Sequence, residues 1–318
     1  MTHPPRRKVV AAFLAVYLFW GSTYLFIKYV VASVPALGMA GARFLLAGVI
    51  LYVVGRARGA EAPRLTHWRS ASIAGAMLMT SNAGVAWSER LIPSGVASLL
   101  VAVTPCWMVL FDWAAARGKR PHAGVALGLI IGLVGVMILI GPSQLLGGAT
   151  LDLRGAAVVL FGSAVWAAGS LYARRAPRPT SPQLMSGMQM MCGGAILSVV
   201  AAVTHQWDGF VLAETPAIAV WSFAYLVVFG SIVAFSAYMY LLTVTTPARV
   251  STYAYVNPVV AVFLGWAFAG ESLTPRMMVA AAIIVSAVAL IVSFGAAESP
   301  QRVSVHTDEF PAATTDSA

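Results

Sequence analysis

Long apolar segments separated by short polar connections run through nearly the whole chain. Ten such segments can be delimited, and each is close to the length of about 20 residues that spans a bilayer as a helix. Their expected bounds are 9–31, 35–55, 70–90, 94–116, 123–141, 154–173, 182–204, 216–242, 247–270 and 276–295. The pattern predicts an all-α polytopic membrane protein with ten transmembrane helices.

The ten predicted helices divide into two halves of similar sequence. An offset of 146 residues matches Trp20 with Trp166, Met39 with Met185, Gly41 with Gly187 and Gly48 with Gly194. An offset of 154 residues matches Pro93 with Pro247 and Pro121 with Pro275. Chance similarity between apolar helices is the alternative, but this shared order of residue types favours a true repeat. Because five is an odd number, the second half would cross the membrane in the opposite direction, which predicts two inverted five-helix repeats.

The Lys and Arg residues predict the orientation of the chain. Fourteen of the 20 lie at the termini or in connections expected on the same side of the membrane as the N-terminus, and three lie in connections expected on the opposite side. By the positive-inside rule, both termini are expected to be cytoplasmic in a bacterial inner membrane. The expected parts are a cytoplasmic N-terminus 1–8, a first repeat 9–141, a periplasmic connection 142–153, a second repeat 154–295 and a disordered cytoplasmic tail 296–318.

Composition supports the membrane interpretation and limits the partners. Of the 318 residues, 59% are hydrophobic and 10% are charged, whereas soluble domains carry about 25% charged residues. The net charge of +9 is spread between the apolar segments, so we expect a lipid bilayer and not nucleic acid as the partner. Cys106 and Cys192 lie in apolar segments without ligand-type neighbours, so no metal or cofactor is expected.

Several short motifs, each weak alone, occur in a specific order. They are Trp20-Gly-Ser-Thr-Tyr24, Arg43-Phe44, Pro93-Ser-Gly95, Phe229-Gly-Ser231, Ala237-Tyr-Met-Tyr240, Tyr253-Ala-Tyr-Val-Asn-Pro258 and Gly270-Glu271. Together they resemble the EamA branch of the drug/metabolite transporter superfamily over residues 9–295, most nearly its YedA-type inner-membrane members. The resemblance implies ten helices in two inverted repeats and secondary transport, usually export of amino acids, related metabolites or toxic compounds. One departure is Gly118-Lys119, where family members often carry Gly-Glu.

Polar and aromatic residues within the predicted spans are the candidates for substrate binding. They are Trp20, Thr23, Tyr24, Asn82, Trp166, Ser170, Tyr238, Tyr253 and Asn257. Indole and phenol groups provide an apolar wall with a few fixed hydrogen bonds, which suits a small amphipathic solute. The alternative for each is a place in the interfacial aromatic belt or in helix packing.

Two prolines, Pro105 and Pro258, fall inside predicted spans. Each removes a helix hydrogen bond and frees a carbonyl, which hydrocarbon tolerates only against protein or a wet cavity. We therefore predict helix breaks that help to line a cavity, with a simple packing kink as the alternative. Asp112, near the inner end of the fourth span, is expected to form an ion pair at the inner face.

Charged residues in the spans suggest a gate. Arg43 lies deepest, and Lys28, Glu89 and Glu271 lie near the outer ends of their spans. Charges inside a membrane are costly, so Arg43 is expected to pair with Glu89 or Glu271 in an outer gate. Snorkelling to the lipid headgroups is the alternative for Lys28. A carboxylate desolvated at a closed gate binds a proton more readily, so Glu89 is the candidate for proton coupling, with a permanent salt bridge as the alternative.

The chain offers less support for other functions. It contains no nucleophile elbow and no phosphate-binding loop, which argues against an integral-membrane enzyme and against a protein that hydrolyses ATP. A passive channel or facilitator normally needs a selectivity ring or a continuous polar pore. The sequence therefore favours an alternating-access exporter of small molecules, with a channel or a membrane enzyme as the alternatives.

Overall fold

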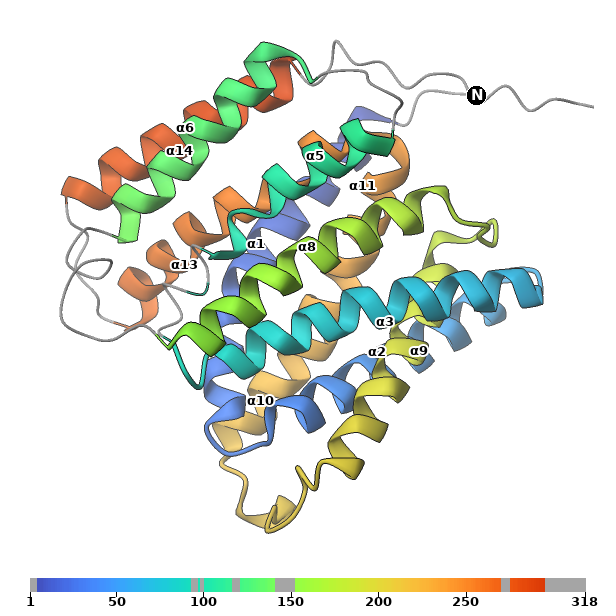
Figure 1. Cartoon of the computed structure of the whole chain (residues 1–318). Coiled ribbons are helices and arrows are strands. Elements are labelled where there is room, and N and C mark those ends of the chain that lie inside the picture. Colours follow the sequence, from blue (N-terminus) through green and yellow to red (C-terminus); the bar gives the residue numbers. More distant parts are fainter. Residues whose placement is uncertain are drawn as a thin grey trace, which may run out of the picture.

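The computed structural model of the chain describes residues 5–92, 97, 100–115, 121–140, 152–269 and 275–294. All regular secondary structure in these residues is helical (Figure 1). The first half contains α1 (Arg6–Val31), α2 (Ala36–Ala57), α3 (Leu65–Ser88), α5 (Thr104–Ala115) and α6 (Ala123–Ile140). The second half contains α8 (Leu153–Arg175), α9 (Pro182–Val203), the short η1 (Leu212–Glu214), α10 (Ala217–Tyr225), η2 (Leu226–Val233), α11 (Ala234–Val244), α12 (Pro247–Val250), α13 (Tyr253–Ala269) and α14 (Pro275–Phe294). Each of the ten predicted spans therefore contains helix.

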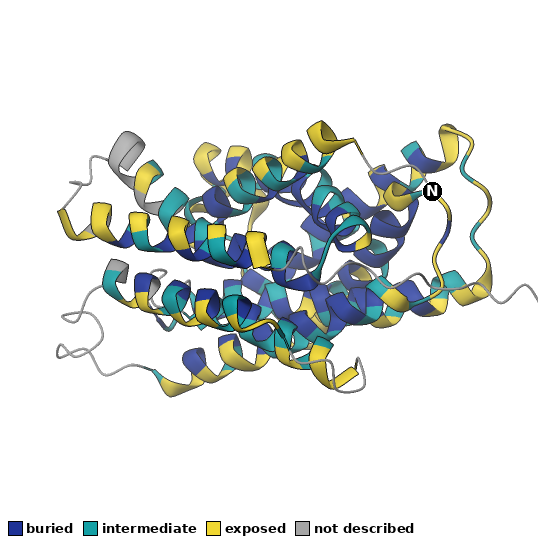
Figure 2. Cartoon of the chain, turned by 90° about the horizontal axis from the view of Figure 1, so that it is seen from above, coloured by how far each residue is buried: buried dark blue, intermediate teal, exposed yellow. Residues whose placement is uncertain are grey.

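The outer faces of the bundle are apolar. Within the described residues, five helical stretches are long and apolar enough to cross a membrane: Arg6–Val31, Ala36–Ala57, Leu153–Arg175, Pro182–Val203 and Ala217–Val244. Figure 2 shows exposed positions on the outward faces of the helices and buried positions inside. The exposed positions include large apolar side chains such as Leu18, Val53, Phe161, Val199 and Val285. Contiguous apolar exposure on this scale fits lipid as the surrounding solvent.

Local sequence signals explain where several helices begin. The Asp152 carboxylate accepts a hydrogen bond from the backbone N–H of Arg154 at 2.8 Å and caps the start of α8. The Arg154 side chain also donates to this carboxylate and lowers the pKa of Asp152 to about 2, so the cap stays ionised. At α9, Ser181 accepts from the backbone N–H of Leu184, and Pro182 occupies the first turn, where its missing N–H is harmless.

Helices from the two halves pack against one another in matching pairs. α2 packs along α9, and α6 packs along α14 at one edge of the bundle (Figure 1). The packing of α3 against α8 corresponds to the packing of α10 and α11 against α1. Likewise, the packing of α5 against α8 corresponds to the packing of α13 against α1. This set of pairs is unchanged when the first half is exchanged for the second.

The predicted interruptions of the fourth and ninth spans are present, but one is displaced. α5 begins at Thr104, directly after a turn, so Pro105 lies in its first turn as a helix break requires. In the ninth span, the chain breaks at Ser251 and Thr252, between α12 and α13, and Pro258 lies inside α13. The prediction that Pro258 marks the break is therefore wrong in position.

Hydroxyl groups satisfy backbone carbonyls at the second break. Ser251 Oγ donates to the carbonyl of Ala248 at 2.9 Å, and Thr252 Oγ1 donates to the carbonyl of Arg249 at 2.7 Å. These bonds satisfy carbonyl groups at the end of α12 and replace helix hydrogen bonds there. Pro258 lies early in α13 and removes only one bond of that helix.

Candidate functional site

A cavity of about 70 Å³ lies among α1, α2, α3, α5, α8 and α13. It is large enough for a few water molecules or part of a small solute. The sequence-predicted substrate residues that line it are Trp20, Thr23, Tyr24, Asn82, Trp166, Tyr253 and Asn257. The structure thus brings together seven of the nine predicted residues, from both halves of the chain.

The sequence reasoning missed several residues of the cavity wall. Ser81, Thr104 and Ser163 contribute hydroxyl-bearing side chains, and Arg43 contributes its guanidinium group. Small hydroxyl residues are common in tightly packed membrane helices, so residue type alone does not separate these three from packing residues. Arg43, a residue of the expected outer gate, also lies on the cavity.

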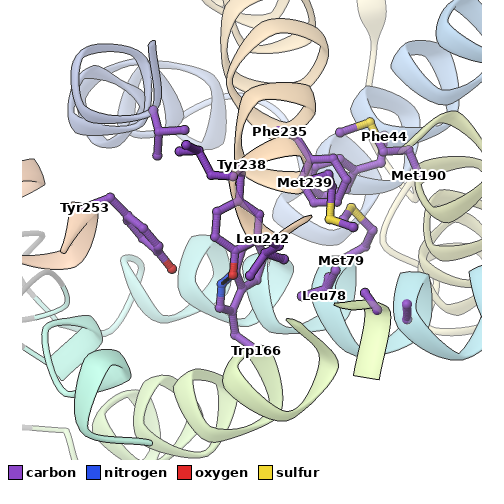
Figure 3. Packing of buried hydrophobic residues seen from close by; sticks show 14 of the residues in the cluster. Phe44, Leu78, Met79, Trp166, Met190, Phe235, Tyr238, Met239, Leu242 and Tyr253 are labelled. Carbon is purple, nitrogen blue, oxygen red and sulfur yellow. Dashed lines mark hydrogen bonds between the residues drawn. The ribbon is translucent and has the colours of Figure 1, made fainter. Parts of the chain in front are cut away.

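One wall of the cavity is aromatic. The ring of Trp20 lies 5.5 Å from that of Trp166, 5.0 Å from that of Tyr238 and 4.9 Å from that of Tyr253, measured between centroids. Figure 3 shows Trp166 and Tyr238 in contact, with Tyr253 facing them from another helix. The contacts of Trp20 with Trp166 and Tyr253 are edge-to-face, an arrangement that fixes the rings relative to one another and gives the cavity a rigid apolar surface.

Ser170 and Tyr238 lie behind this wall and do not line the cavity. Trp166 Nε1 donates to the Tyr238 hydroxyl at 3.1 Å, and that hydroxyl lies 2.5 Å from Ser170 Oγ. Ser170 Oγ donates to the carbonyl of Trp166 at 2.7 Å, so Tyr238 must be the donor in its bond to Ser170. The closed chain of bonds holds the Trp166 indole in place, which gives these two residues a positioning role in the described conformation.

The eighth span contains a π-helical segment, η2, that the sequence did not predict. Within it, the carbonyl of Gly230 accepts a hydrogen bond from Trp20 Nε1 at 2.9 Å, and Ser231 Oγ accepts one from Arg43 Nε at 2.7 Å. Wider helical turns are frequent at functional sites because they leave backbone groups available to other partners. The motif Phe229-Gly-Ser231 identified this region, but its residue types do not encode the π geometry.

Arg43 is 2% exposed and bonds to Ser231 rather than to a carboxylate. Its guanidinium carbon also lies 4.9 Å from the ring centroid of Phe44. The ion pairs among the described residues are Asp152–Arg154, Asp112–Arg175 and His205–Asp208, so the expected pair with Glu89 is not formed in the part of the chain that is described. Glu271, the other expected partner, lies outside the described residues.

Glu89 follows the end of α3 and carries a buried carboxylate. Neither of its oxygens has a hydrogen-bond partner among the described residues. Lys28 acts on it electrostatically, but the two groups are not within ion-pair distance, and Lys28 is exposed, as the snorkelling alternative predicts. Lys28 and Glu89 therefore interact without forming a salt bridge, and Arg43 forms none with a described carboxylate.

An ion pair joins α5 and α8 beside a second hollow. Asp112 Oδ1 lies 2.7 Å from Arg175 Nη2, so the expected ion pair of Asp112 is confirmed, with a partner on α8. The adjacent groove has a volume of about 480 Å³ and is lined mainly by apolar and aromatic side chains such as Phe111, Leu171 and Tyr172. Leu171, Tyr172 and Arg175 follow Trp166 along α8, so groove and cavity share this helix.

Comparison with known proteins gives a consistent result over most of the chain. The family described as "EamA-like transporter family" matches twice, over residues 7–141 and 153–293. The "Uncharacterized inner membrane transporter YedA" of Escherichia coli (strain K12) is 36% identical over 284 residues, which cover 88% of this chain and 89% of the relative. The "Probable terminal-alkyne amino-acid exporter" of Streptantibioticus cattleyicolor is 25% identical over 293 residues, which cover 89% and 93%.

A solved crystal structure has the same fold. It aligns with a TM-score of 0.72 at 18% sequence identity and covers 91% of this chain and 99% of its own. Because the identity is low, the likeness concerns the arrangement of helices alone.

Proposed function

Because the chain belongs to the EamA-like transporter family, we propose that it is a secondary active transporter of small amphipathic solutes that works by alternating access. The observation that carries this proposal is the cavity. Its lining comes from α1, α2, α3 and α5 of the first half and from α8 and α13 of the second. Transporters with internal repeats bind their substrates between the repeats, so that rocking of one half against the other exposes the same site to each side.

The two halves are proposed to form an inverted repeat. Close contacts between α2 and α9 support this arrangement, because they occur in pairs related by the same offset of 146 residues. A Cβ at Gly41 would lie 2.7 Å from Ser198, and one at Gly187 would lie 2.7 Å from Tyr52. A Cβ at Gly48 would lie 2.5 Å from the backbone N of Met191, and one at Gly194 would lie 2.5 Å from that of Leu45. Exchanging the halves thus maps each contact onto its partner.

The proposed site is the cavity itself. Trp20, Trp166 and Tyr253 would hold the apolar part of the solute, and Thr23, Tyr24, Asn82 and Asn257 would supply hydrogen bonds. The relative from Streptantibioticus cattleyicolor is named as an amino-acid exporter. We propose that this chain likewise exports amino acids or related compounds. The protein would lie in the inner membrane with both termini in the cytoplasm, as the distribution of Lys and Arg indicates.

Proton coupling is proposed to depend on Glu89. An ionised carboxylate that is buried without hydrogen bonds is unfavourable by several kcal/mol, and protonation removes that penalty. A change in the environment of Glu89 between outward and inward conformations would then load and release a proton during each cycle.

Reconstituted protein tests the proposal directly. Proteoliposomes loaded with a panel of metabolites are expected to show saturable counterflow, in which internal unlabelled solute accelerates the uptake of external labelled solute. Proton coupling is tested by measuring the flux of the same metabolites into inside-out vesicles with and without a pH gradient. Flux that never saturates and shows no counterflow would indicate a channel and contradict the proposed carrier.

A further inference from the structure

The cavity contains a buried positive charge. Arg43 reaches the cavity from α2 and is 2% exposed. Among the described residues, no carboxylate lies within ion-pair distance of its guanidinium group. An isolated charge removed from water is strongly unfavourable unless an opposite charge or a full set of hydrogen bonds compensates for it.

Neighbouring groups compensate for this charge only in part. A guanidinium group has five N–H donors, and the single hydrogen bond from Arg43 to a described residue runs from Nε to Ser231 Oγ. The hydroxyl of Ser231 is neutral and fixes the orientation of the group without cancelling its charge. With Nε occupied, the free edge of the guanidinium is the one that carries both Nη nitrogens. That edge presents two parallel donors, the geometry that matches a carboxylate.

A second buried polar atom in the same cavity also lacks a partner. Asn257 lines the cavity and is 3% exposed, and its Oδ1 atom has no hydrogen-bond partner among the described residues. Buried polar atoms are nearly always hydrogen-bonded in native structures. An exception that faces a cavity is therefore a candidate contact for a donor on the bound solute. Ile27, Val85 and Val101 add apolar surface beside these two polar groups.

We propose that Arg43 binds the carboxylate of the transported solute, so that the substrates are small organic acids, amino acids included. This inference rests on the proposed transport function and adds the chemical class of its substrate. The carboxylate accepts two hydrogen bonds from the Nη edge of Arg43. A donor on the solute, such as an ammonium group, bonds to Asn257 Oδ1, and the apolar part of the solute lies against the aromatic wall. The bound acid neutralises Arg43, which replaces the outer-gate role that the sequence suggested for this residue.

Matched pairs of compounds isolate the contribution of the carboxylate. The probes are L-alanine, L-leucine and L-phenylalanine, each compared with its carboxamide. Binding to the purified full-length protein is followed by the concentration dependence of thermal stabilisation. We expect at least one acid to bind roughly ten- to a hundredfold more tightly than its amide, since a charge-assisted pair of hydrogen bonds is lost in the amide.

Variants assign this preference to one side chain. Arg43→Gln is expected to remove the preference for the acid, and Arg43→Lys to retain it with weaker binding, because ammonium keeps the charge but not the paired donors. Gln189→Met is the matched control. Gln189 stands at the equivalent position of the second half, is fully buried and does not line the cavity, so this variant should bind like the wild type. Size-exclusion profiles establish that each variant is folded.

The outcomes separate this inference from the transport function. If none of the acids binds, if acids and amides bind equally, or if Arg43→Gln binds the acid as tightly as the wild type, the role of Arg43 is wrong. Counterflow restricted to solutes that carry no carboxylate would likewise overturn it while leaving the transporter proposal intact. Acid binding that depends on Arg43 without counterflow of any compound would support the binding site and contradict the transport function.

Discussion

At the residue scale, Glu89 combines burial with an absence of hydrogen bonds to its carboxylate among the described residues. Glu89→Gln keeps the shape of the side chain but cannot take up a proton. We expect the variant to retain counterflow and to lose the response of net flux to a pH gradient, because a neutral amide cannot change its protonation during the cycle. Flux measurements in inside-out vesicles with and without the gradient test this.

The matched control is Glu61→Gln, at an exposed position in the connection before α3. It should respond to the gradient as the wild type does. If Glu89→Gln is also driven by the gradient, proton coupling does not depend on this residue.

The Tyr238 hydroxyl lies at the centre of the bonds that hold Trp166. Tyr238→Phe leaves the buried Trp166 Nε1 without its acceptor, which should destabilise the protein by about 1–3 kcal/mol. The midpoint of thermal unfolding in detergent measures the effect. Tyr29→Phe, at an exposed position of α1, is the comparison and should leave the midpoint unchanged. Equal midpoints for both variants would mean that the hydroxyl network is not formed.

At the element scale, close approach of α2 and α9 depends on glycine. A Cβ at Gly48 would lie 2.5 Å from the backbone N of Met191, whereas one at Gly55 would have its nearest neighbour at 3.4 Å, an ordinary contact with Leu184. Gly48→Ala should therefore force the helices apart and destabilise the protein by about 1–3 kcal/mol. Gly55→Ala on the same helix should be tolerated. The two unfolding midpoints decide the matter, and a tolerated Gly48→Ala would show that the helices are not packed this closely.

The π-helical segment η2 positions the cavity residues of the first half. A Cβ at Gly230 would lie 2.8 Å from Arg43 Nη2 and 3.0 Å from Thr23. Gly230→Ala should therefore displace the flexible end of the Arg43 side chain. This displacement should weaken acid binding although the charge of the cavity is unchanged. The comparison of acid and amide binding measures this effect, and undiminished acid binding by a folded Gly230→Ala protein would place the solute elsewhere.

Sequence pattern was sufficient for the helices because membrane spans are encoded redundantly by some 20 apolar residues each. It was not sufficient for the irregular backbone. The break in the ninth span lies at Ser251 and Thr252, whose hydroxyl groups bond to carbonyls at the end of α12, and not at Pro258. The residues of η2 bond to Trp20 and Arg43 on other helices, and the local sequence does not reveal such tertiary partners.

The cavity was predicted in part for a related reason. Aromatic residues such as Trp20, Trp166 and Tyr253 are distinctive in a span, and they do line the cavity. Tyr238 is equally distinctive, but its hydroxyl group bonds to Ser170 within the protein behind the wall. Whether a polar side chain faces a cavity or a neighbour depends on helix rotation, which residue type alone does not determine.

At the scale of the whole molecule, two related halves surround the cavity. The helix pairs α2–α9 and α6–α14 each join an element to its own counterpart, and pairs such as α3–α8 and α5–α8 have counterparts when the halves are exchanged. A carrier built this way can adopt two conformations of similar energy that differ in which side of the cavity is closed. The central claim is therefore that the cavity becomes accessible from each side of the membrane in turn.

Thiol accessibility in sealed vesicles tests that claim most directly. With Cys106 and Cys192 replaced by alanine, Ser163→Cys places one thiol on the cavity wall, and Ser186→Cys places one at a buried position of α9 away from it. We expect a membrane-impermeant thiol reagent to label Ser163→Cys in both right-side-out and inside-out vesicles and to label Ser186→Cys in neither. Labelling of Ser163→Cys from one side only, or from neither, would contradict alternating access to this cavity.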